Sequence, residues 1–251
     1  MNALLLDAGN TRLKWRLADE TQLHSLAYDE GFESVLRSAL PSSVDVAYLA
    51  CVAPPRIRDI VQRVVLERAV RLSEARTMAQ LDRLQIAYMQ PAHLGVDRFL
   101  VLLECAALQR DVLIVSVGTA LTVDFLRADG HHRGGRIAPS PTQMRAHLAS
   151  LSAALPASGG AWSPDQPFAT DTDHALASGC EGMAIALITA SLEAARREAP
   201  ETELWIHGGG AQTLLPMLPQ ACMLPSDVVL RGLARWAGLP CSDVTGYTPG
   251  R

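Results

Sequence analysis

The sequence predicts an α/β protein made of two similar halves, each a sheet with helices packed on it. Apolar runs typical of buried strands begin at residues 3 and 112, and each run meets a glycine-containing turn. Two more strand-like runs follow in each half, and helical and strand patterns then alternate, as in layered α/β folds. We therefore expect one domain over residues 1–110 and a second over 111–251.

The first half begins with three predicted strands joined by short turns. The run Ala3-Leu4-Leu5-Leu6 predicts a buried strand, and Pro54-Pro55 marks the end of a later strand. The helix predicted near its end is apolar on nearly all faces, which is typical of a helix buried in a core or at a subunit interface. We expect strands at 3–8, 12–18, 22–28, 44–53 and 69–73, and helices at 30–39, 55–67 and 97–110.

The second half repeats this order. The run Val112 to Val117 predicts a buried strand that meets Gly118, and Gly130 marks a turn between the next two strands. The segment 153–170, rich in Ala, Ser, Gly and Pro, is predicted to be a long loop, which in a compact domain is usually a lid, a binding loop or an interface segment. We expect strands at 112–117, 121–126 and 204–206, a third hairpin strand after residue 130, and helices at 141–151, 171–198 and 226–236.

Composition excludes several classes of protein. A net charge of −4 and an aromatic content of 5% do not favour a nucleic-acid partner. No apolar run approaches the length of a membrane span, and the N-terminus lacks the basic region of a signal peptide. The 5 cysteines are scattered without a CxxC pair or a zinc spacing, which indicates a reducing cytoplasm. We therefore expect a cytoplasmic protein with no membrane and no nucleic acid as partner.

The segment from Asp7 to Lys14 is the most informative in the chain, and it ends at the only lysine. It joins the first two predicted strands through a tight turn, and its residues are Asp7-Ala8-Gly9-Asn10-Thr11-Arg12-Leu13-Lys14. Backbone amides in such a turn bind anions, a lysine neutralises phosphate, and a carboxylate can hold Mg²⁺ together with phosphate groups. The segment therefore suits a phosphate chain, with Asp7 as a magnesium position acting through phosphate or water. An ordinary hairpin with a surface lysine is the alternative.

A second candidate site opens the helix predicted at 97–110, at Gly95-Val96-Asp97-Arg98. An acid in the first turn of a helix is favoured by the helix dipole, so a structural acid with a neighbouring salt bridge is one interpretation. The functional interpretation is a carboxylate base, Asp97, beside a guanidinium, Arg98, that binds a carboxylate.

Glycine turns also follow two strands of the second half. Ser116-Val117-Gly118-Thr119-Ala120 mirrors the first phosphate-binding turn, although a tight hairpin is the alternative. The Gly208-Gly209-Gly210 cluster stands between a strand and a helix, where amides at a helix N-terminus bind phosphate or adenosine. Three glycine turns gathered between two related domains are how the actin-like kinase superfamily holds ATP.

These segments together resemble the type III pantothenate kinases, over nearly the whole chain from Leu4 to Trp236. The resemblance rests on five motifs in the family's order, namely Asp7 to Lys14, Tyr88 with Pro91 to Arg98, Gly118 to Asp124, Gly134 to Pro139, and Asp171-Thr172. It implies two ribonuclease H-like, actin-like domains with a nucleotide cleft between them. It also implies that the chain phosphorylates pantothenate with ATP, in the first step of coenzyme A synthesis.

The resemblance implies roles for particular residues. Asp97 would be the general base, and the segment Asp7 to Lys14 would bind ATP together with Thr119. Pantothenate would contact Tyr88, the segment Gly95 to Arg98, and Thr172. The family members are homodimers that use ATP with Mg²⁺, and many need a monovalent cation, K⁺ or NH₄⁺, at the position of Ser116.

Three positions depart from the family pattern. Ser116 stands where many members have an acid associated with the monovalent cation, Ser140 stands where the pattern has glycine, and Gly210 replaces an acid or amide. The departures at Ser116 and Gly210 are the only support for a second hypothesis, a catalytically weak relative that acts as a regulatory or accessory protein. A phosphatase of the same superfamily is a third hypothesis, but such an enzyme would be expected to lack the Gly-x-Asp-Arg motif.

Overall fold

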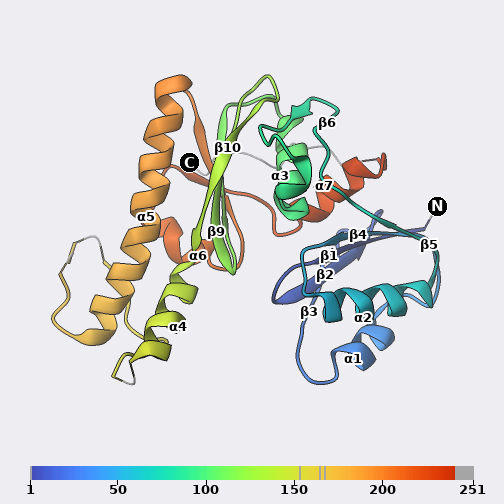
Figure 1. Ribbon diagram of the computed structural model, residues 1–251, viewed down its shortest axis with the longest axis horizontal. Helices are drawn as coiled ribbons and strands as arrows, with labels where there is room; N and C mark the ends of the chain where they lie inside the picture. The colour runs from blue at the N-terminus through green and yellow to red at the C-terminus, as the bar shows by residue number, and fades with distance from the viewer. Residues whose placement is uncertain (1, 153, 164, 167, 241–251) are drawn as a thin grey trace. The chain divides into compact units, whose positions relative to one another are not determined.

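The computed structural model describes residues 2–152, 154–163, 165–166 and 168–240 (Figure 1). Contacts within the chain divide it into two compact units. In the described part of the chain, unit 1 comprises residues 2–108 and 227–240, and unit 2 comprises the residues between 109 and 226. Each unit has one five-stranded sheet with helices packed on it, so the predicted α/β class is confirmed.

The sheet of unit 1 has the strand order β3-β2-β1-β4-β5. Its first three strands form antiparallel hairpins, whereas β4 and β5 run parallel to β1. This order follows from the connections, because short turns join antiparallel neighbours while parallel neighbours need a helical crossover. The strands are β1 (Ala3–Ala8), β2 (Arg12–Leu17), β3 (His24–Ala27), β4 (Val44–Cys51) and β5 (Ala69–Glu74).

Helices cover both faces of this sheet. All six residues of β1 are buried, as expected for a central strand covered on both sides. Helices α1 (Phe32–Ala39) and α2 (Pro55–Leu66) lie on one face, and α3 (Val96–Ala106) and α7 (Val228–Trp236) lie on the other (Figure 1). Short elements precede α3, and they are β6 (Gln80–Leu81), β7 (Leu84–Gln85) and the 3₁₀ turn η1 (Pro91–His93).

Unit 2 repeats the topology with the strand order β10-β9-β8-β11-β12. Strands β8, β9 and β10 are antiparallel neighbours, and β11 and β12 continue the sheet in parallel. The predicted pattern of three hairpin strands followed by alternating helices and strands is therefore present twice. The strands are β8 (Val112–Val117), β9 (Ala120–Leu126), β10 (His132–Pro139), β11 (Glu203–His207) and β12 (Ala221–Met223).

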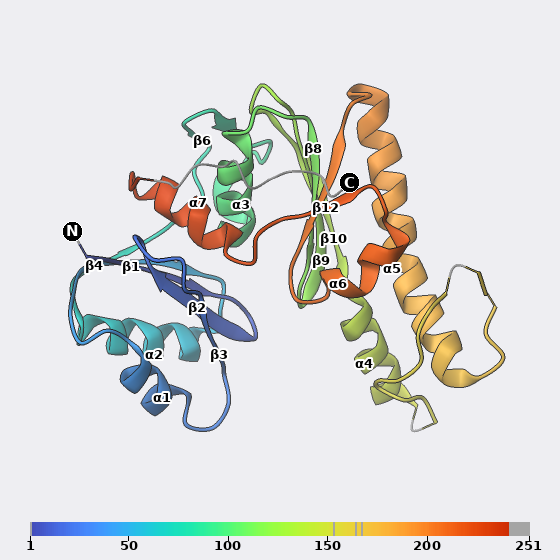
Figure 2. The ribbon, with the colours of Figure 1, turned by 180° about the vertical axis from the view of Figure 1, so that it is seen from behind.

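The long helix α5 (Thr172–Glu198) forms the helical layer of unit 2 (Figure 2). Its buried side chains, such as Ile188 and Leu192, pack against β8 and β9. It is the one helix in the described part of the chain that is long and apolar enough to cross a membrane, by length and composition alone. This corrects the expectation that no run approaches that length, and it is explained by the packing of α5 in the core of unit 2. The other helical elements are α4 (Pro141–Leu151), α6 (Ala211–Leu214) and the 3₁₀ turn η2 (Leu215–Met217).

The structure differs from the sequence-based expectations at the second helical layer of unit 1. Helix α3 ends at Ala106 rather than near residue 110, and Gln109 already has a left-handed φ of 55°. Residues 98–106 are all buried within the single chain, so the apolar faces of α3 belong to the core and do not indicate a subunit interface. Helix α7 groups with unit 1 because it packs on α3, β1 and β4, although the expected second domain, 111–251, included it.

Helices α3 and α7 lie side by side and approach at backbone distance. A Cβ atom added to Gly232 of α7 would lie 2.0 Å from the carbonyl oxygen of Leu100 in α3. One turn further on, Nε of Arg235 lies 3.1 Å from Oε2 of Glu104, whose side chain is buried. The glycine thus permits the close contact, and the ion pair fixes which residues of the two helices face each other.

We expect Gly232→Ala to lower the free energy of unfolding by about 2–3 kcal/mol, because the new methyl group overpacks a contact with backbone atoms that cannot move aside. Urea unfolding measures the effect. Gly179→Ala is the matched control, because Gly179 is an exposed helical glycine of α5 whose added Cβ would meet nothing within 4 Å. Its replacement should stabilise the protein by about 0.5–1 kcal/mol. Equal effects of the two substitutions would contradict the close contact.

Candidate active site

The turn between β1 and β2 places the predicted phosphate-binding residues of unit 1. Gly9 donates its N–H to the carbonyl of Arg12 at 3.1 Å, which closes a tight turn with Asn10 and Thr11 exposed at its tip. Tyr28, which the sequence analysis did not single out, donates its hydroxyl to the carbonyl of Gly9 at 2.9 Å. The turn is thus held from β2 and from the segment after β3.

Not all eight residues of the predicted segment can face a ligand with their side chains. Ala8 and Leu13 are fully buried in the core of unit 1, so only their backbone atoms can contribute. Asp7 and Lys14 are paired across the β1–β2 ladder, which sets the carboxylate beside the ammonium group. Arg12 is exposed and bonds Ser25 on β3 through its guanidinium at 3.4 Å.

Asp7 is a buried carboxyl group with a strongly shifted pKa. Its pKa is raised from 3.8 to about 7, mainly by burial and partly by the Asp97 carboxylate, while Lys14 opposes the rise. Asp7, Lys14 and Asp97 are therefore close enough to interact electrostatically, although they come from two hairpin strands and from α3. A buried carboxylate whose ionisation is disfavoured by burial fits a divalent cation, because a bound cation restores the charged form.

The start of α3 holds Asp97 and Arg98 in defined positions. Oδ1 of Asp97 accepts the backbone N–H of Arg98 at 2.9 Å, and Gly95 is the residue that precedes the helix. A Cβ atom on Gly95 would lie 2.7 Å from that same oxygen and would displace the carboxylate. The glycine of the Gly-x-Asp-Arg motif therefore leaves room for the acid in the first turn of the helix.

Arg98 is oriented by Tyr88. Its Nη1 donates to the Tyr88 hydroxyl at 3.3 Å, and its guanidinium carbon lies 5.9 Å from the centre of the tyrosine ring. The loop between them is fixed by Thr77, whose hydroxyl donates to the carbonyl of Leu94 at 2.7 Å. Arg98 is buried, and its guanidinium contacts Tyr88.

In unit 2, the two glycine turns meet at the carboxyl ends of β8 and β11. Gly118 closes the β8–β9 turn by donating to the carbonyl of Ala120 at 2.9 Å, which leaves Thr119 exposed at the tip. Gly208 has a left-handed φ of 102°, and a Cβ atom there would lie 2.4 Å from the carbonyl oxygen of Val117. Gly210 donates its N–H to the same carbonyl at 3.0 Å, and its own Cβ would lie 2.8 Å from Cγ1 of Val117.

The structure gives physical reasons for two of the three departures from the family pattern. Gly210 packs so closely on Val117 that a Cβ atom at this position would require the Val117 side chain to shift. Ser140 caps helix α4, because its hydroxyl accepts the backbone N–H of Gln143 at 3.3 Å. Both departures are therefore consistent with the local structure.

The third departure, Ser116, lies half-buried near the end of β8. It pairs with Thr122 on β9 and with His207 on β11. Asp124, the first acid after Ser116 in the sequence, is buried, and its Oδ1 lies 3.0 Å from Nε2 of His132. In the part of the chain that the structure describes, no three side chains of His, Cys, Asp or Glu form a cluster that could hold a metal ion.

Thr172 is the first residue of α5, and it is exposed. Asp171 caps the helix by accepting the backbone N–H of His174 at 2.9 Å. The predicted motif Asp171-Thr172 therefore forms a capped helix start, as expected from the sequence. Taken together, the predicted residues fall into a group in unit 1 around Asp7, Asp97 and Arg98, and a group in unit 2 at the β8–β9 turn and the start of α5.

A family model for type III pantothenate kinases matches residues 3–194. The chain belongs to the type III pantothenate kinase family. It is 45% identical over 244 residues to a type III pantothenate kinase of Stenotrophomonas maltophilia strain K279a, with 94% of this chain and 98% of the relative covered. It is 43% identical over 242 residues to one of Xanthomonas axonopodis pv. citri strain 306, with the same coverage.

Solved structures with low sequence identity share the fold of this type III pantothenate kinase family member. A protein of Campylobacter jejuni, named as a conserved Baf family transcriptional activator, aligns with a TM-score of 0.62 at 17% identity, covering 94% of this chain and 97% of its own. A 2-dehydro-3-deoxygalactonokinase protein of Sinorhizobium meliloti aligns with a TM-score of 0.60 at 15% identity, covering 94% and 98%. A chain of the PilM–PilN type IV pilus biogenesis complex aligns with a TM-score of 0.55 at 13% identity, covering 96% and 99%.

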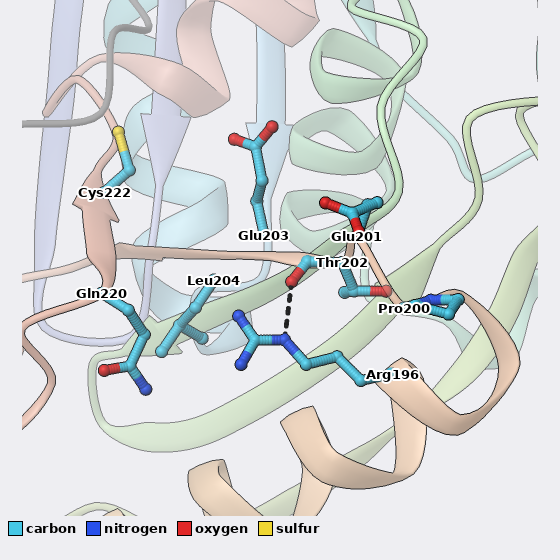
Figure 3. Close-up of a pocket in the computed structure, with 8 residues that line it drawn as sticks. All are labelled: Arg196, Pro200, Glu201, Thr202, Glu203, Leu204, Gln220 and Cys222. Carbon is cyan, nitrogen blue, oxygen red and sulfur yellow. Dashed lines mark hydrogen bonds between the residues drawn. The ribbon is translucent and has the colours of Figure 1, made fainter.

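A hollow of about 240 Å³ in unit 2 lies away from the candidate site (Figure 3). It lies at the amino ends of β11 and β12, whereas the glycine turns are at the opposite ends of these strands. Two of its charged groups already have partners, since Arg196 donates to the carbonyl of Thr202, and Glu203 accepts from Arg110 and Trp205. None of the residues predicted to bind ATP or pantothenate lines it.

The raised pKa of Asp7 predicts a dependence of stability on pH. The folded state holds this proton more tightly than the unfolded state, so the contribution of Asp7 to stability falls as pH rises from about 4 to about 7. Asp7→Asn removes this titration. We therefore compare the unfolding free energy of Asp7→Asn minus that of wild type at the two pH values. This difference should be more positive at pH 8 than at pH 5 by about 2 kcal/mol, because only wild type loses stability over this range.

Urea unfolding at the two pH values tests this expectation. Asp59→Asn is the matched control, because Asp59 is an exposed carboxylate on α2 of the same unit. Its effect should be the same at both pH values. A pH-independent effect of Asp7→Asn would show that the carboxyl group is ionised as easily in the folded as in the unfolded chain.

Proposed function

We propose that this protein is a pantothenate kinase, which transfers the γ-phosphoryl group of ATP to the primary hydroxyl of pantothenate in the first step of coenzyme A synthesis. The family assignment supports this activity, since the curated relatives bear that name over 94% of this chain. The observation that carries the proposal is that Asp97 interacts with the buried Asp7 and accepts the amide of Arg98, whose guanidinium donates to Tyr88.

We assign the role of general base to Asp97. It takes the proton of the attacking hydroxyl as the new O–P bond forms and the bond from the γ-phosphorus to the β,γ-bridging oxygen of ATP breaks, which releases ADP. Its position at the start of α3 and its hydrogen bond from the Arg98 amide hold the carboxylate in place. Most of the rate enhancement comes from holding the two substrates in line and stabilising charge.

We assign the carboxylate of pantothenate to Arg98, with Tyr88, Gly95, Val96 and Thr172 as further contacts. A buried guanidinium already oriented by a tyrosine is a suitable partner for a carboxylate, because little side-chain entropy remains to be lost on binding. The amide-rich start of α3 further favours an anionic substrate group.

We assign the phosphates of ATP to the segment Asp7 to Lys14 and to Thr119. Lys14 neutralises phosphate charge, and the exposed turn of Gly9, Asn10 and Thr11 offers backbone amides. Mg²⁺, bound through phosphate and water near Asp7, would supply charge neutralisation in the transition state.

We also propose a cytoplasmic homodimer. Cys51, Cys105, Cys180 and Cys222 are free thiols, which supports a reducing compartment, and Cys241 lies outside the described residues. The proposal of a homodimer is supported by the family resemblance and by exposed apolar side chains of unit 2. These side chains are Ile137, Leu151, Phe168 and Met183. The buried helix α3 does not support the homodimer.

The accessory-protein hypothesis has lost part of its basis. It depended on the departures at Ser116 and Gly210, and the packing of Gly210 on Val117 gives that residue a structural reason. Steady-state turnover with pantothenate and ATP separates an enzyme from an accessory protein.

Asp97→Asn tests the catalytic assignment. The substitution keeps the shape of the side chain and removes the proton acceptor, so kcat should fall by about 10²–10⁴-fold while the KM values for ATP and pantothenate change little. The exposed Asp59→Asn variant should retain wild-type turnover. A kcat for Asp97→Asn within a few-fold of wild type would rule out Asp97 as the base.

Because position 116 carries a serine, we expect monovalent cations to activate turnover only weakly. A hydroxyl is a neutral ligand that offsets the desolvation of a cation less well than a carboxylate, and Asp124 is already bonded to His132. We expect Ser116→Asp to gain dependence on K⁺ in the turnover assay, compared with the same assay in Na⁺. Strong K⁺ activation of the unmodified protein would contradict this expectation.

A further inference from the structure

A buried pair of opposite charges in unit 2 lies outside every residue assigned above. Arg145 belongs to α4 and Glu181 to α5, and their exposed fractions are 9% and 6%. Burial raises the pKa of Glu181, while a backbone N–H and Arg145 lower it. Removing two charges from water costs several kcal/mol per ion, so such a pair requires compensating bonds.

Both charged groups bind the backbone of one segment of the long loop, residues 154–163. The guanidinium Nη2 of Arg145 donates to the carbonyl of Gly159. The backbone N–H of Trp162 faces the Glu181 carboxylate and lowers its pKa. Arg145 therefore contacts the carbonyl of Gly159, and Glu181 contacts the amide of Trp162 three residues later. The segment is thus fixed at two points.

The same segment packs on the first turn of α5. Gly160 has a left-handed φ of 62°, and a Cβ atom there would lie 2.3 Å from the carbonyl oxygen of Asp173 and 2.7 Å from the backbone nitrogen of His174. A Cβ atom on Gly159 would lie 3.4 Å from Oδ2 of Asp173. Backbone thus meets backbone directly beside Thr172, and a displacement of the segment would release the helix start.

We propose that Arg145 and Glu181 are positioning residues for pantothenate, which hold residues 154–163 against the first turn of α5 and so keep Thr172 in place. The inference rests on the proposed function, because it assigns pantothenate to Thr172. It adds two residues that do not themselves touch the substrate and a role for the segment 154–163.

Stability alone does not account for this pair. Nε of Arg145 is buried and has no hydrogen-bond partner among the described residues, so the charge is only partly satisfied. Replacing buried charge pairs by apolar residues of similar volume is often neutral or stabilising. A purely structural role would therefore be served as well by methionine and leucine, whereas positioning the loop backbone needs one donor and one acceptor.

The double variant Arg145→Met/Glu181→Leu separates the two roles. We expect its thermal unfolding midpoint to remain at or above that of wild type, whereas its KM for pantothenate rises about tenfold, the effect of losing one well-placed contact. Its KM for ATP should stay within about twofold, because the ATP contacts lie on other elements. Amide exchange at residues 159–163 should become faster, with exchange in β8 and β9 unchanged.

Two further variants sharpen the comparison. Glu181→Gln keeps an oxygen that can accept the Trp162 N–H, so its pantothenate KM should lie between those of wild type and the double variant. Arg110→Met is the matched control, because it breaks a more exposed ion pair with Glu203 in the same unit and at the other end of the sheet. It should leave both KM values and the exchange of residues 159–163 unchanged.

Several outcomes would overturn the inference. Unchanged exchange at residues 159–163 in the double variant would show that the pair does not hold the segment. Faster exchange with an unchanged pantothenate KM would show that the segment positions nothing. Equal increases of both KM values would indicate a general loss of structure in unit 2. Wild-type protein without pantothenate kinase activity would refute the proposed function and with it the role toward pantothenate, and the exchange measurement would then decide the anchoring separately.

Discussion

The backbone contact between α3 and α7 is the constraint on which unit 1 depends. Gly232 lets α7 approach the carbonyl of Leu100, and the Glu104–Arg235 pair sets the register of the two helices. Arg16 on β2 ties the start of α7 to the sheet through Asp227 at 3.4 Å, on the strand that also carries Lys14. The helix that presents Asp97 is therefore held by the last helix of the described chain, and the same network reaches the β1–β2 hairpin.

Buried charge is concentrated where the chain must hold polar groups in fixed positions. Asp7 and Arg98 are each largely removed from water, and each has an opposite charge or a hydrogen-bond partner nearby. Arrangements of this kind cost folding energy and occur mainly at functional sites. Arg16 is a buried charge with a structural role, since its Nη1 donates to three backbone carbonyls at the end of β2 and in the turn that follows.

Most of the fold could be predicted from the sequence because local patterns and long-range structure agree. Uninterrupted apolar runs gave β1 and β8, and glycine turns marked their ends. Short elements such as β12 and the β6–β7 hairpin carry too few residues for a periodic signal, so they were missed. The place of α7 could not be predicted, because its partner α3 lies more than a hundred residues earlier and the decisive residue is a single glycine. Tyr28 and the Arg145–Glu181 pair were missed for the same reason, as their partners are backbone atoms of distant segments.

Packing also changes how the departures from the family pattern are interpreted. A pattern of residue types treats Ser140, Gly210 and Ser116 alike, as three positions where an expected side chain is absent. The structure separates them, because Ser140 caps a helix and Gly210 has no room for a side chain beside Val117. Ser116 has neither reason, since it lies half-buried in the β8 ladder between Thr122 and His207. Of the three departures, Ser116 is the one for which the packing of the described residues gives no reason. A chemical difference from the family pattern is therefore expected at Ser116 first.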